Sequence, residues 1–90
     1  MHIMYQIELS EAALDDLNDF SPTEVEEIYS FLLSLADNPK PAGIRTLSLP
    51  EAASGIAYLY ATTLNSIYYE IFDGDNLVRI VAIFKKISLN

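Results

Sequence analysis

The sequence predicts an α+β fold: an N-terminal strand, then two helices, then an antiparallel sheet of three to four strands. Apolar residues alternate with a period of two in residues 3–9, follow the helical period of 3.6 in residues 11–36, and alternate again from residue 56 onward. The last three strands have short connections, which is typical of an antiparallel meander. We expect one domain over residues 1–90, because a chain of 90 residues is near the smallest size that folds alone.

The opening residues predict a half-buried strand from Ile3 to Leu9, followed by a short helix that ends near residue 20. Ser10 is a favourable N-cap for this helix, and Glu11 stands in the first turn, where the helix dipole favours an anion. The apolar side of the helix is expected to consist of Ala13, Leu14, Leu17 and Phe20.

The second helix has the clearest boundaries in the chain. Ser21-Pro22-Thr23-Glu24 combines an N-cap, a proline at the first helical position and a glutamate placed for a capping box. Pro39 and Pro41 end the helix, because proline lacks an amide donor and disfavours helix in the preceding residue. The core-facing stripe is expected to consist of Val25, Ile28, Tyr29, Leu32, Leu35 and Ala36.

Strand-forming segments make up the rest of the chain. An Asp-Gly-Asp-Asn turn at residues 73–76 is a strong hairpin signal. We expect the first strand to join the same sheet and both helices to pack on one of its faces. The segments are a short strand at residues 45–49, a loop at residues 50–55, and strands at residues 56–62, 66–72 and 77–84.

The charge is strongly negative and unevenly distributed. The net charge is -8, and residues 1–39 contain nine acidic residues and no Lys or Arg. Nucleic-acid binding depends on several contacts from Lys or Arg to phosphates, so we expect no strong direct binding of DNA or RNA. Asp15, Asp16 and Asp19 lack the loop spacing of a calcium site, and we predict neither a metal nor a cofactor.

Composition also bears on location. The chain has no cysteine, which excludes disulfides and thiolate catalysis and fits a reducing compartment. No apolar run approaches the roughly 18 residues of a membrane-spanning helix, and the opening residues do not resemble a signal peptide. We therefore expect a cytoplasmic protein with no membrane association.

Alternation along the predicted sheet separates two faces. If Ile67, Tyr69 and Ile71 face the helices, the intervening residues face away and include several apolar side chains. A contiguous surface of this kind is costly in water and typical of a protein contact, whereas scattered surface apolar residues are the plainer interpretation. The candidate partner-contact face consists of Leu59, Ala61, Ser66, Tyr68, Glu70 and Phe72.

Three stretches carry a resemblance to a known family. They are the strand, serine cap and acidic helix of residues 5–19, the sequence Leu-Ala-Asp-Asn-Pro-Lys-Pro-Ala-Gly at residues 35–43, and the hairpin that ends at Lys85-Lys86. Together with the order of elements, they resemble the RelE/ParE superfamily of small bacterial toxins. The resemblance implies a RelE/ParE-like fold, a toxin–antitoxin or plasmid-stabilisation system, and an antitoxin-like protein as a partner.

The chain departs from this family where the RNA-cleaving members carry their active site. The resemblance places their arginines, which stand on two adjacent strands, near Ala61 and Ser66. Residues 56–72 contain no Lys, Arg or His, and residues 85–90 contain no Tyr or His. Cleavage needs cations for the developing charge and an acid at the leaving oxygen, so we predict no catalytic residues.

Three functional hypotheses follow. The first is a toxin-family protein that acts through contacts with an antitoxin-like protein or a second copy, with DNA gyrase or the ribosome as a candidate target. The second is a ribosome-dependent mRNA endonuclease with an atypical site. The third is an inactive acidic orphan that titrates an antitoxin. The missing cations favour a non-enzymatic role over the second hypothesis.

Overall fold

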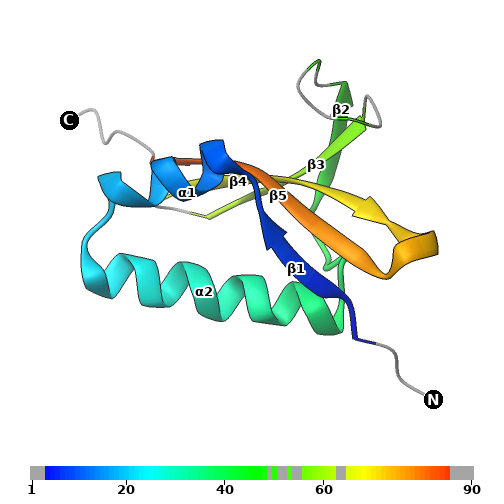
Figure 1. The fold of residues 1–90 in the computed structure, drawn as a ribbon, viewed down its shortest axis with the longest axis horizontal. Helices are drawn as coiled ribbons and strands as arrows, with labels where there is room; N and C mark the ends of the chain where they lie inside the picture. The colour runs from blue at the N-terminus through cyan, green and yellow to red at the C-terminus, as the bar shows by residue number, and fades with distance from the viewer. Residues whose placement is uncertain (1–3, 49, 51–52, 54–55, 63–64, 86–90) are drawn as a thin grey trace.

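The computed structural model describes residues 4–48, 50, 53, 56–62 and 65–85. Helix α2 (Pro22–Asp37) runs along one face of a sheet, and the shorter α1 (Glu11–Asp16) lies beside the last strand (Figure 1). In order across the sheet, the strands are β1 (Gln6–Leu9), β5 (Leu77–Lys85), β4 (Asn65–Phe72), β3 (Ile56–Ala61) and β2 (Arg45–Ser48).

The predicted α+β class and the order of strand, two helices and antiparallel meander are confirmed. The sheet has five strands rather than three or four, and β1 pairs in parallel with β5 while the other pairs are antiparallel. Alternation predicts that a strand is half-buried, but it does not predict which strand will pair with it. Here the pairing of β1 depends on the path that the two helices take along the sheet. Ile3, the predicted start of the first strand, and residues 86–90 lie outside the described residues.

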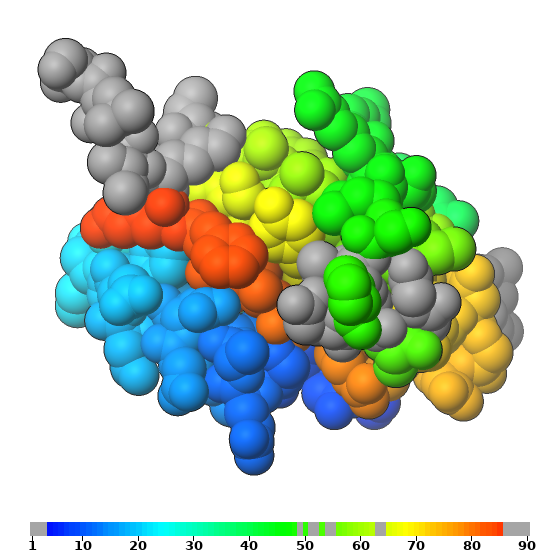
Figure 2. Space-filling view, turned by 90° about the horizontal axis from the view of Figure 1, so that it is seen from above, coloured from blue at the N-terminus to red at the C-terminus, as the bar shows by residue number. Residues whose placement is uncertain are grey.

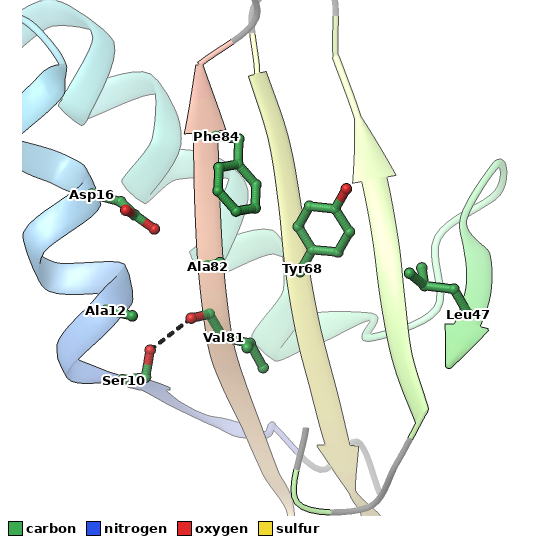
Figure 3. Close-up of a pocket in the computed structure, with 8 residues that line it drawn as sticks. All are labelled: Ser10, Ala12, Asp16, Leu47, Tyr68, Val81, Ala82 and Phe84. Carbon is green, nitrogen blue, oxygen red and sulfur yellow. Dashed lines mark hydrogen bonds between the residues drawn. The ribbon is translucent and has the colours of Figure 1, made fainter. Parts of the chain in front are cut away.

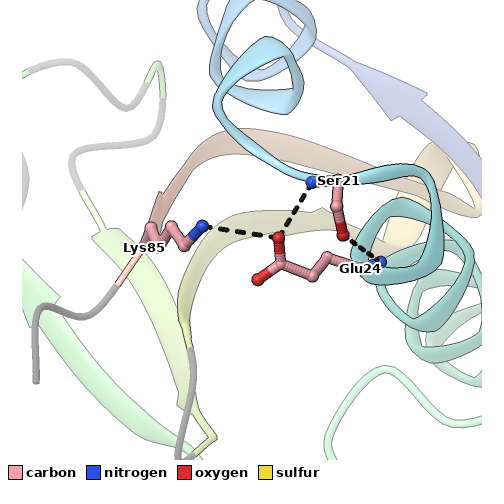
Figure 4. A network of polar contacts seen from close by, with 3 residues as sticks. All are labelled: Ser21, Glu24 and Lys85. Atoms are coloured by element: carbon pink, nitrogen blue, oxygen red, sulfur yellow. Dashed lines mark hydrogen bonds and ion pairs between the residues drawn. The ribbon is translucent and has the colours of Figure 1, made fainter.

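Both helices begin at the predicted caps. The Ser10 hydroxyl accepts the Ala13 N–H at 3.0 Å, and the Ser21 hydroxyl accepts the Glu24 N–H at 3.2 Å. Glu24 Oε1 accepts the Ser21 N–H at 2.8 Å, which completes the capping box, and lies 3.4 Å from Lys85 Nζ on β5 (Figure 4). In the described part of the chain, neither helix is long and apolar enough to cross a membrane.

The core lies between α2 and the sheet. Ile28, Leu32 and Leu35 of α2 are buried in one cluster with Tyr69 and Ile80. The Tyr69 hydroxyl donates to the Pro39 carbonyl at 2.8 Å, and burial raises the pKa of this hydroxyl well above its ordinary value.

The predicted apolar stripes are correct for most positions and wrong for two. Leu14 and Tyr29 are 51% and 43% exposed. A helix that packs against a single sheet buries only a narrow face, so the margins of each stripe stay in solvent. The two positions lie at those margins.

The β4–β5 hairpin turns at the predicted residues. Asp73–Asp75 form a turn of 3-10 helix, and Asn76 closes it in the left-handed conformation with φ 50°, which asparagine tolerates better than most residues. The Tyr5 hydroxyl donates to Asp73 Oδ1 at 2.7 Å and ties the start of the chain to this turn. Tyr5 therefore helps to align β1 along β5.

We predict that the Glu24 cap makes stability depend on pH in the acid range. The backbone N–H of Ser21, with a smaller contribution from Lys85, lowers the pKa of Glu24 below its ordinary value. A lowered pKa in the folded state stabilises the fold above the unfolded-state pKa, and this contribution is lost as the pH falls through the folded-state value. In urea unfolding at a series of pH values, the free energy of unfolding of the natural protein should therefore fall more steeply toward acid pH than that of Glu24→Gln. Parallel curves would contradict the prediction.

Candidate functional site

The face of the sheet that points away from α2 carries the candidate residues. In the strand register, Leu59 lies opposite Tyr68, and Ala61 opposite Ser66, whereas the intervening Ile67 is buried in the core. Tyr68 and Ser66 in turn lie opposite Ala82 and Phe84 of β5. These residues therefore share the outer face, which Figure 2 shows with the end of β5 (orange to red) between α1 (blue) and β4 (yellow).

Two of the candidate residues, Glu70 and Phe72, lie at a polar end of this face. Glu70 is 1% exposed and its Oε1 accepts the Ala53 N–H at 3.1 Å. The guanidinium of Arg79 lies 5.4 Å from the centroid of the Phe72 ring and its Nη2 lies 3.7 Å from Glu8 Oε1. The Glu70 carboxylate thus accepts a hydrogen bond inside the protein, and the guanidinium of Arg79 partly covers the Phe72 ring.

The other end of the face is hollowed into a groove of about 520 Å³. Its floor includes Tyr68 and Phe84, whose rings meet edge to face with centroids 5.4 Å apart. One wall comes from α1 and the residue before it, and the far side comes from β2 (Figure 3). The lining residues are Ser10, Ala12, Asp16, Leu47, Tyr68, Val81, Ala82 and Phe84.

Of the six candidate residues, only Tyr68 lines this groove. Phe84, which is not one of the candidate residues, also lines the groove, and simple alternation along β5 would not have placed it there. Counting from the pair Phe72–Leu77 without a break would place Ile83 opposite Ser66, but a β-bulge shifts the register between Tyr68 and Tyr69. Tyr68 pairs with Ala82 and Tyr69 with Ile80, so Val81 is the extra residue. The shift turns Phe84 outward and Ile83 into the core.

Hydrogen bonds from α1 and its cap hold it against β5 just beyond this bulge. The pairing of β1 with β5 ends at Leu9 and Ile80, which leaves the next stretch of β5 without a strand on that side. The Ser10 hydroxyl donates to the Val81 carbonyl at 2.8 Å, and Asp16 Oδ2 accepts the Ile83 N–H at 2.9 Å. Side chains thereby replace the missing strand and fix the wall of the groove.

No protein-family model matches the sequence, and neither does any curated protein. Solved structures do match. A chain of the RelBE2 toxin–antitoxin complex from Mycobacterium tuberculosis superposes with a TM-score of 0.79, covering 96% of this chain and 95% of that chain at 17% sequence identity. The chain has the RelE toxin fold.

Two further structures share the RelE fold. The isolated RelE toxin of E. coli gives a TM-score of 0.74, covering 94% of this chain and 87% of that chain at 16% identity. The archaeal RelE–RelB complex from Pyrococcus horikoshii OT3 gives a TM-score of 0.75, covering 92% of this chain and 96% of that chain at 13% identity. The agreement extends over nearly the whole length of each chain.

On this RelE fold, the groove offers little for acid–base chemistry. Ala61 and Ser66, the positions that the resemblance assigns to arginines, face each other across β3 and β4. None of the groove residues described above is cationic. The Ser10 hydroxyl both donates and accepts a hydrogen bond, and Asp16 accepts one from the backbone. The polar groups of the α1 wall thus have structural hydrogen bonds, and the remaining lining is mainly apolar.

We predict that Asp16 stabilises the fold more than its neighbour Asp15 does. Asp16→Ala leaves the Ile83 N–H without its acceptor and should lower the free energy of unfolding by about 1.5 kcal/mol. Asp15 is exposed, and Asp15→Ala should change this free energy by less than about 0.5 kcal/mol. Urea unfolding measures both, and amide exchange at Ile83 should speed up only in Asp16→Ala. Equal losses in the two variants would contradict this role for Asp16.

Proposed function

We propose that this chain belongs to a toxin–antitoxin or plasmid-stabilisation system, works in the cytoplasm, and acts through protein–protein contacts without cutting mRNA. An antitoxin-like protein is the proposed partner. The observation that carries the proposal is the groove on the outer face, whose lining is mainly apolar and, among the residues that the structure describes, contains no cation. The RelE fold supplies the context, since similar structures were solved as complexes named toxin–antitoxin complexes.

The argument against mRNA cleavage is electrostatic. Phosphodiester cleavage develops negative charge on the phosphate, and enzymes lower that barrier with preorganised cations or hydrogen-bond donors. The neighbouring positions Ala61 and Ser66 supply no charge, and the Lys85 ammonium is 3.4 Å from Glu24. A net charge of -8 further opposes the approach of RNA.

The argument for a protein contact rests on exposed apolar surface. Phe84 is 53% exposed, and Tyr68 packs edge-on against it with only half-burial. Leu59 and Ala82 flank Tyr68 in the same row of the sheet. Aromatic residues in such a row are frequent anchors of interfaces, because their burial removes a large apolar area from water.

The first test is an mRNA cleavage assay with translating ribosomes, with an RNA-cleaving member of the toxin family as the positive control. We expect the mRNA to stay intact, because none of the described residues that line the groove is a cation that could stabilise the charge developing on the phosphate. Cleavage that survives purification and is lost in Tyr68→Phe would overturn the proposal in favour of an atypical endonuclease.

The second test concerns the contact face and uses the protein encoded next to this chain's gene as the probe. Leu59→Glu places a charge in the outer-face row and should weaken binding of that protein by about tenfold or more. Leu33→Glu is the matched control, since Leu33 is 67% exposed on α2, away from the outer face. Calorimetry measures the affinities, and circular dichroism verifies that both variants fold. Equal affinities in the two variants would show that the partner binds elsewhere.

A further inference from the structure

We infer that the groove binds a basic amphipathic segment of a partner protein, with apolar side chains on the floor and Lys or Arg side chains against α1. This inference rests on the proposed protein-contact function and adds the chemistry of the partner. It follows from the chemistry of the groove, because the floor is apolar and the wall formed by α1 is acidic.

The floor of the groove requires apolar side chains. Tyr68, Ala82 and Phe84 present ring and methyl surface, and Leu47 lies across from them on β2. A volume of about 520 Å³ is in the range of pockets that enclose small ligands or a few side chains of a peptide. Burying apolar groups here removes the exposed ring of Phe84 from water.

The α1 wall is acidic. Asp16 lines the groove, Glu11 and Asp15 are exposed on the same helix, and Asp19 follows in the next turn. In the described part of the chain none of these four carboxylates forms an ion pair, and residues 4–39 contain no Lys or Arg. Among the described residues, the helix that forms this wall therefore carries negative charge without an ion-pair partner, and Asp16 brings part of that charge to the groove itself.

Cations elsewhere on the outer face do not neutralise this wall. Arg45 lies at the opposite edge of the sheet, where it pairs with Leu59 across β2 and β3. Arg79 contacts Glu8 at the polar end, and Lys85 contacts Glu24 on α2. An occupant that lies along β5 therefore meets carboxylates on the α1 side.

The charges exclude the other common occupants. A nucleic acid or an anionic membrane surface would be repelled by the wall and by the net charge of -8. A second copy of this chain would carry the same net charge, and its acidic surface would repel the acidic surface of the first. An acidic segment would meet the same repulsion, whereas a basic amphipathic segment satisfies both floor and wall.

The test uses three short synthetic peptides with a fluorescent label. One is built from Leu and Lys, the second has Glu in place of Lys, and the third has Ser in place of Leu. Fluorescence anisotropy with the natural protein should show saturable binding of the first peptide only, with an affinity that falls as salt increases. Saturable binding of the Glu peptide, or no saturable binding of the Lys peptide, overturns the inference.

Two pairs of variants locate the binding. Glu11→Gln with Asp15→Asn should weaken binding of the Leu–Lys peptide by about fivefold at low salt, because two exposed wall charges are removed. Glu26→Gln with Glu27→Gln changes the net charge equally on α2, where both residues are exposed, and should have less than about a twofold effect. Phe84→Ala should weaken binding by about tenfold, while Leu33→Ala on α2 should not.

Equal losses in the two charge variants would mean that the peptide senses only net charge, and this overturns the inference. The result is separable from the proposed function. If the neighbouring gene's protein binds through the Leu59 face with an acidic segment, the contact function stands and the inference fails. If mRNA is cut, the contact function fails whatever the peptides do.

Discussion

The outer face of this protein depends on how the backbone of β5 is satisfied after β1 ends. A strand at the edge of a sheet leaves unpaired N–H and C=O groups, which are costly unless another group bonds them. Ser10 and Asp16 bond this edge at Val81 and Ile83. The same contacts anchor α1, a helix too short to be stable alone. The bulge at Val81 then turns Phe84 outward, so one local arrangement creates both the wall and the floor of the groove.

Much of the fold follows from local patterns in the sequence. Side-chain periodicity predicts each element type, and the capping box at Ser21 and the turn at residues 73–76 have local signatures. The position of β1 beside β5 has no local signature, because pairing joins residues about seventy positions apart. The exposure of Leu14 and Tyr29 likewise depends on how far the sheet extends under each helix. Long-range packing therefore determines the strand pairing and the exposure of individual side chains, which periodicity alone does not predict.

The candidate site was predictable only in part, for the same reason. Alternation assigns Leu59, Ala61, Ser66 and Tyr68 to one face, and the strand register places them there. Their role in binding stays a prediction. Glu70 shares that face, yet its carboxylate bonds the backbone of Ala53, and nothing local in Tyr-Glu-Ile marks such burial. Ala12 and Leu47 reach the groove from α1 and β2, so no single segment of the sequence contains the site.

The comparison with RelE structures separates what the fold requires from what a function requires. At 13–17% identity, a TM-score above 0.7 shows that this fold tolerates wide substitution of its sequence. The outer face is less constrained, because side chains such as Phe84 and Leu59 lie outside the buried cluster between α2 and the sheet. A change of side chain there costs the fold little but changes which molecules can bind. In this chain, the apolar floor of the groove and the acidic residues of α1 are the two features on which the proposed basic amphipathic partner segment depends.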